Sequence, residues 1–176
     1  MRNRVIKLIF PAIAILLLAP WPVAYAYSYD GGLSASGEVQ IEAAAPSDAP
    51  SAMVFGHAVG SIIPGDLFFI DSTGSPVDFT VTMHITNTDE LTHHYRYMVL
   101  RVKAYVENGA GEWVEVTEYD GQPLPETYIT LRSGYVELNL HGYGRYKIAI
   151  DSGNYRCTAI SADGGSTSPR FYLTTN

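Results

Sequence analysis

Cysteine is almost absent from this sequence. Cys157 is the only one in 176 residues, so the chain forms no disulfide with itself. Stability must therefore come from the core, from bound metal or from neighbouring chains. We interpret Cys157 as a buried, inert thiol, with an intermolecular bridge as the alternative.

Basic residues are few as well. The chain has 11 Lys and Arg against 18 Asp and Glu, which gives a net charge of −7. This balance argues against nucleic acid as a partner, because Lys and Arg are what neutralise phosphates. It is compatible with cation binding, and with repulsion that keeps copies of the chain dispersed until the charge is screened.

Only one long apolar run occurs, near the N-terminus. Residues 8–19 are apolar with one proline, three basic residues precede them, and the small-x-small motif A-Y-A follows at 24–26. This pattern predicts a cleaved export signal over residues 1–26. The run is too short to favour a transmembrane span of ~20 residues, and an uncleaved membrane anchor is the alternative. We expect a secreted, extracellular chain, residues 27–176, with 8 basic and 18 acidic residues and a net charge of −10.

Patterns typical of catalytic or transition-metal sites are missing. The five histidines show no H-x-H, H-x-E or H-E-x-x-H spacing, and Cys157 lacks a C-x-x-C partner. No serine lies in G-x-S-x-G or S-x-x-K. The sequence thus favours a protein that is not an enzyme, and an enzyme is the third choice among function classes.

The clearest pattern that is present lies at residues 77–107, where two stretches alternate between apolar and polar residues. A period of two with β-branched residues predicts strands with one buried and one wet face. We expect a long antiparallel hairpin, joined by a polar connection over 87–94. Its inward residues are expected to be Phe79, Val81, Met83 and Ile85, then Met98, Leu100, Val102, Ala104 and Val106.

Shorter strand patterns, separated by turn residues, fill the rest of the chain, and no window shows a helical period. Pro64-Gly65 and the N-G-A-G stretch at 108–111 are the strongest turn signals. Nine or ten short strands predict an all-β fold, an antiparallel jelly-roll or Ig-like β-sandwich over residues 53–176. The further strands are expected at 53–59, 67–70, 113–119, 128–131, 135–140, 145–150, 155–161 and 171–174. The stretch D-S-G-N-Y-R-C at 151–157 is interpreted as a sandwich-like tyrosine turn.

The segment at 27–52 is interpreted as separate from this domain. Residues 34–43 alternate like a strand, but the apolar face is mostly small, which suits a narrow groove where another backbone approaches closely. Residues 43–52 are rich in Ala and Pro and form a linker that reaches ~30 Å when extended. The first strand is therefore free to fold onto its own domain or onto a neighbour's. Its small-residue face is Ala35, Gly37, Val39, Ile41 and Ala43.

Oxygen-bearing side chains in loops are candidates for calcium, which prefers carboxylates and carbonyls. The candidate ligands are Asp66, Asp71, Asp78, Asp89 and Glu90, and Asp30, Asp120 and Asp163 adjoin glycines. Most such residues are simply solvated turn residues.

Tyrosine is frequent in the predicted strands. These side chains could form a platform that binds sugar rings or a contact between subunits, and the alternative is that they occupy half-buried positions of the sheets. They are Tyr95, Tyr97, Tyr105, Tyr128, Tyr135, Tyr146, Tyr155 and Tyr172.

These features together resemble cannula subunits, secreted proteins that form hollow extracellular tubes in hyperthermophilic archaea of the Pyrodictium group. The resemblance rests on the export signal, the small-residue strand at 35–43, the V-G-S-I-I-P turn at 59–64, and the stretch V-T-M-H-I-T-N-T-D-E-L-T-H-H-Y-R-Y-M-V-L-R-V at 81–102. It covers residues 34–106, roughly half of the mature chain.

The resemblance implies a jelly-roll-like subunit that polymerises with itself, with calcium assisting assembly. The N-terminal strand of one subunit would fill a groove in the next by donor-strand complementation. Ala35, Gly37, Val39, Ile41 and Ala43 would then be the inserted face, and Phe79, Val81, Met83 and Ile85 a groove wall. The alternative function is a secreted monomeric binding module for carbohydrate or another cell-surface ligand.

Overall fold

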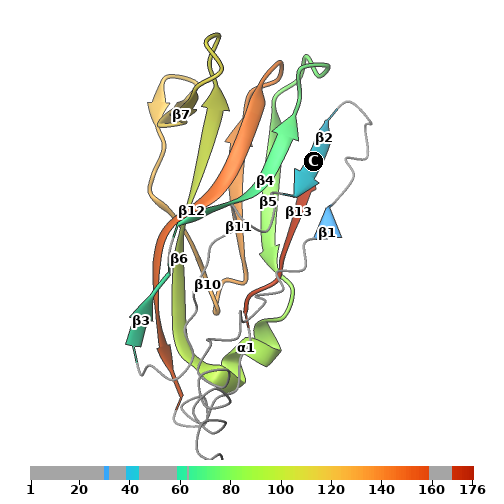
Figure 1. Ribbon diagram of the computed structural model, residues 1–176. Helices are drawn as coiled ribbons and strands as arrows, with labels where there is room; N and C mark the ends of the chain where they lie inside the picture. Colours follow the sequence, from blue (N-terminus) through green and yellow to red (C-terminus); the bar gives the residue numbers. More distant parts are fainter. Residues whose placement is uncertain (1–29, 32–38, 44–58, 63, 159–167) are drawn as a thin grey trace, which may run out of the picture.

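The computed structural model describes residues 30–31, 39–43, 59–62, 64–158 and 168–176. It shows an all-β sandwich of two facing sheets, as the strand pattern predicts (Figure 1). The predicted signal at 1–26 lies outside the described residues, as do most of the strand at 53–59 and the end of the one at 155–161.

The smaller sheet has four strands in the order β1-β13-β5-β11. β5 runs antiparallel to both β13 and β11, while the short β1 pairs with β13 in parallel. The strands are β1 (Asp30–Gly31), β5 (Phe79–Ile85), β11 (Tyr135–Leu140) and β13 (Phe171–Thr175).

The larger sheet has seven strands and is entirely antiparallel. Five follow the order β10-β6-β12-β4-β2, while β3 also pairs with β12 and β7 with β6. The strands are β2 (Gln40–Ala43), β3 (Val59–Ser61), β4 (Gly65–Asp71), β6 (Tyr95–Glu107), β7 (Trp113–Glu115), β10 (Thr127–Thr130) and β12 (Arg145–Cys157). A separate two-stranded ribbon joins β8 (Glu118–Tyr119) to β9 (Gln122–Pro123).

The inward residues of both sheets form one hydrophobic core. The predicted alternation in β5 and β6 is confirmed, because Phe79, Val81, Met83 and Ile85 and then Met98, Leu100, Val102 and Ala104 are all buried. Val106 packs partly buried against them. Cys157 is buried, and burial raises the pKa of its thiol, as expected for an inert cysteine. Within the described part of the chain, no helix is long and apolar enough to cross a membrane.

The predicted hairpin at 77–107 is wrong, because β5 and β6 belong to opposite sheets. The connection between them is a short helix, α1 (Thr88–His94), at one end of the sandwich (Figure 1). Leu91 is its buried residue, and acids in the first turn and histidines in the last suit the helix dipole. A helix of 7 residues is too short to produce a periodic signal, so the sequence pattern missed it.

The strands predicted at 145–150 and 155–161 are one strand, β12, within the described residues. The tyrosine turn predicted at 151–157 is therefore wrong. The pairing with β6 shifts register between Ile150 and Ser152, which marks a β-bulge. Gly153 serves close packing there, because a Cβ at this position would lie 2.8 Å from the Val99 carbonyl oxygen. A glycine in a strand therefore marks a close approach of backbones and not a reversal.

Of the two strongest turn signals, one is a turn in the structure and the other is not. The N-G-A-G stretch forms the predicted hairpin between β6 and β7. Pro64-Gly65 does not reverse the chain, because β3 and β4 both run antiparallel to successive parts of β12. The strand predicted at 113–119 divides into β7 and β8, and only β7 pairs with β6.

Gly142, in the turn between β11 and β12, should tolerate no side chain. A Cβ there would lie 2.4 Å from the Ser75 carbonyl oxygen and 2.9 Å from that of Val77. We expect Gly142→Ala to lower the free energy of unfolding by about 1–3 kcal/mol, the usual cost of overpacking. Gly109→Ala is the matched control, because nothing lies within 4 Å of its Cβ position. Equal thermal unfolding midpoints for the two variants would contradict this packing.

Candidate functional site

The N-terminal strand β2 lies at the edge of the larger sheet and pairs with β4 of the same chain. The register joins Gln40 to Asp71, Ile41 to Ile70 and Glu42 to Phe69. The side chains alternate as predicted, since Gln40 and Glu42 are exposed and Ile41 is partly buried against the core. Val39, just before the strand, is only 5% exposed. Ala43 ends β2 half-buried, and Ala35 and Gly37 lie outside the described residues.

The four residues expected to wall a groove lie in the interior. Phe79, Val81, Met83 and Ile85 belong to the same buried cluster as Val39. Their strand, β5, is hydrogen-bonded on both sides, to β13 and to β11. The backbone edge that β2 covers is therefore that of β4, and β5 contributes side chains to the core beneath it.

The outer side of this edge carries residues that the sequence did not single out. A hollow of about 190 Å³ runs along β2 and β4 and is also lined by Trp113 and Arg145. The Trp113 and Phe69 rings lie 5.8 Å apart, and the Lys147 amine is 5.4 Å from the Trp113 ring centre. These contacts come from strands distant in sequence, so only the strand order brings them together.

Two of the predicted calcium ligands, both on β4, are engaged by other protein groups. The Asp66 carboxylate lies 3.2 Å from the Lys147 amine. Asp71 accepts hydrogen bonds from the Thr73 hydroxyl at 2.6 Å and from the Thr73 backbone N–H at 3.0 Å. These bonds, with Arg145 nearby, hold the pKa of Asp71 below its ordinary value of 3.8.

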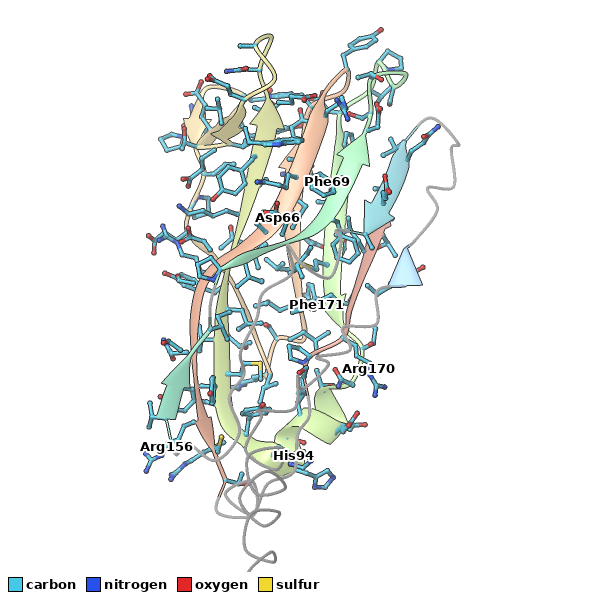
Figure 2. All side chains as sticks on the ribbon, viewed as in Figure 1. Asp66, Phe69, His94, Arg156, Arg170 and Phe171 are labelled. Atoms are coloured by element: carbon cyan, nitrogen blue, oxygen red, sulfur yellow. The ribbon has the colours of Figure 1, made fainter. Side chains whose placement is uncertain are left out.

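Two more predicted ligands, Asp89 and Glu90, lie in the first turn of α1. Glu90 is 3.6 Å from the Arg170 guanidinium and accepts a hydrogen bond from the Asn87 amide at 3.4 Å. Figure 2 shows Arg170 near α1 and well away from Asp66 on β4. The five acids thus do not come together at one place.

The fifth predicted ligand, Asp78, is the centre of an exposed polar cluster with Asp120 and His141. One ligand atom from each of the three lies within 4.8 Å of the others. Asp78 lies 2.9 Å from His141 Nδ1 and accepts hydrogen bonds from the Gly142 N–H and the Tyr119 hydroxyl. The Tyr119 and His141 rings stack with centres 4.6 Å apart. The Gly142 and His141 bonds lower the pKa of Asp78.

This cluster does not fit calcium. Calcium takes 6–8 oxygen ligands, whereas the three residues offer two carboxylates and an imidazole nitrogen. The oxygens of Asp78 already accept protein hydrogen bonds. These three side chains alone therefore do not make a calcium cage, and the cluster fixes the β8–β9 ribbon to the turn after β11.

No short spacing in the sequence indicates the role of His141. Asp78 and His141 are 63 residues apart. They meet because β5 pairs with β11 so that Phe79 lies opposite Leu140, which places the residues just beyond the pair side by side. The register of two strands is needed to find such a pair.

The tyrosines do not gather on a single face. Tyr95 and Tyr155 are buried with their rings 5.5 Å apart, and Tyr146 is buried as well. Tyr97, Tyr105 and Tyr128 lie on the larger sheet, and Tyr135 and Tyr172 on the smaller one. The buried and half-buried interpretation therefore holds for some of these tyrosines, and the exposed ones are divided between the two sheets.

Comparison with protein-family models gives no match to this sequence, and comparison with curated proteins gives none either.

The bonds of Asp78 predict an acid-dependent contribution to stability. A carboxyl whose folded pKa is depressed stabilises the fold above its unfolded pKa and loses this contribution as pH falls through the folded value. The difference in unfolding free energy between wild type and Asp78→Asn should therefore shrink below pH 3.8, the ordinary carboxyl value. Asp120→Asn is the control within the same cluster. Denaturant titrations across this range measure the effect, and a difference that does not vary with pH would contradict it.

Proposed function

We propose that this protein is a structural subunit of an extracellular filament or tube, secreted and assembled from copies of itself by exchange of β2. The observation that carries the proposal is the position of β2, an edge strand that pairs only with β4 among the residues that the structure describes. The resemblance to cannula subunits points in the same direction.

The chain between β2 and the rest of the domain is long enough for exchange. Residues 44–58 separate Ala43 from Val59. At ~3.3 Å per residue, these fifteen residues span up to ~50 Å when extended. The covalent connection therefore does not dictate whether β2 pairs with its own β4 or with that of a second copy.

Removing β2 would leave β4 with a row of unpaired N–H and C=O groups and would uncover the core beside Ile70. Such an edge is a template for an added strand. A strand from another copy would restore the same hydrogen bonds and bury Val39 in the same place. Because the contacts are equal, the balance between the two arrangements depends on linker strain and on chain concentration.

Each subunit in this scheme gives one strand and accepts one. A head-to-tail contact of this kind yields filaments or tubes when the rotation from one subunit to the next does not close a ring. With a mature net charge of −10, copies repel one another, and divalent cations such as calcium would assist assembly by screening. This role for calcium requires no dedicated cage within one chain.

Two substitutions on the inward side of β2 test the proposal. In Val39→Asp/Ile41→Asp, two carboxylates would have to be buried without partners, which costs several kcal/mol. We expect polymers to disappear from negative-stain electron micrographs, with calcium and with a chelator, while folded monomer remains. Deleting residues 27–45 should have the same result. The matched control is Gln40→Asp, which adds a carboxylate at an exposed position of the same strand. Polymers that survive the double substitution would refute strand exchange.

A further inference from the structure

The smaller sheet presents an aromatic row on its outer face. In the register of β13, β5 and β11, Tyr172 lies opposite His84, and His84 lies opposite Tyr135. Their neighbours along each strand point into the core, so these three side chains share the outer face. The His84 and Tyr135 rings are 6.0 Å apart, and Tyr135 is 52% exposed. With strands ~4.8 Å apart, the row spans ~10 Å.

Small polar side chains continue this face on one side of the row. The next outward positions are Thr174, Thr82 and Glu137, followed by Thr80 and Asn139. The Thr80 hydroxyl donates to the Asn139 amide oxygen at 2.8 Å, which leaves the amide nitrogen directed elsewhere. Within the described part of the chain, no hydrogen bond or ion pair engages the exposed Glu137 carboxylate. The face thus combines rings with donors and acceptors for hydroxyl groups.

The residue types on this face argue against a protein partner and against a phosphate or acidic polymer. The outward positions of β5, β11 and β13 that make up this face include no aliphatic side chain and are mostly small and polar beside the aromatic row, whereas the fully buried centre of a protein interface is more apolar than the surrounding surface. They also include no Lys or Arg, so they offer nothing to a phosphate or to an acidic polymer. The larger sheet differs, because its outer face carries paired charges such as Lys103–Glu115 at 2.8 Å and Arg101–Glu126 at 2.7 Å.

We propose that the outer face of β13, β5 and β11 binds a neutral, extended polysaccharide. Its sugar rings would lie across Tyr172, His84 and Tyr135, and its hydroxyls would bond to Glu137 and Asn139. A pyranose ring has an apolar C–H face that packs on an aromatic ring and a rim of hydroxyls that needs polar partners. Glu137, the one acidic residue among the outward positions of β5, β11 and β13, accepts hydroxyl hydrogen bonds and repels acidic sugars. None of these binding residues belongs to β2.

The test is affinity electrophoresis of the full mature chain in native gels containing hydroxyethyl cellulose, xylan or galactomannan, with polygalacturonate as the acidic polymer. We expect at least one neutral polymer to retard the protein and polygalacturonate not to. Tyr135→Ala should weaken this retention about tenfold, the effect of losing one ring contact, and Tyr172→Ala should act likewise. Tyr135→Phe should retain binding, because the ring remains.

Tyr97→Ala is the matched control, since Tyr97 is 40% exposed but lies on the larger sheet. The proposal is overturned if no neutral polymer retards the wild type, if Tyr135→Ala and Tyr97→Ala behave alike, or if the acidic polymer binds more tightly. A Tyr135→Ala variant that alters self-assembly without altering polysaccharide retention would instead identify this face as a subunit contact.

Discussion

The ladder between β6 and β12 is the interaction on which the rest of the structure depends. Both strands have 13 residues, and they pair along most of their length. β10 and β7 pair with β6, and β3 and β4 pair with β12. Among the described strands of the larger sheet, β2 alone pairs with neither, since it is attached through β4. Release of β2 would therefore leave the pairing of β6 with β12 intact.

The sequence predicts strands better than it predicts their partners. The alternation in β5 and β6 identifies the buried residues because side chains in a strand repeat with a period of two. It does not tell which sheet each strand joins, and α1, which carries the chain between the sheets, is too short to show a period. Gly153 illustrates the same limit, because a glycine that ends one strand and a glycine that lets two strands pack closely look alike in sequence.

The polar sites depend on register even more strongly. Asp78 meets His141 only because Phe79 pairs with Leu140, and the aromatic row exists only because His84 lies between Tyr135 and Tyr172. No local spacing contains this information. The same holds for the edge at β4, whose pairing with β2 follows from the strand order. In each case the sequence contains the residues, but only the pairing and order of the strands show which of them lie together.

Exchange of β2 between chains is tested most directly by crosslinking two different chains. Glu42 and Phe69 lie opposite each other in the β2–β4 register, at a spacing that a disulfide can bridge. One chain carries Glu42→Cys and a second, larger tagged chain carries Phe69→Cys, both with Cys157→Ser. The two are mixed under assembly conditions, oxidised, and separated on a non-reducing gel. Strand exchange predicts a crosslinked species that contains one chain of each size and that neither chain forms alone. If this species is missing, while a single chain with both Glu42→Cys and Phe69→Cys closes its own disulfide, β2 remains on its own domain and the account is contradicted.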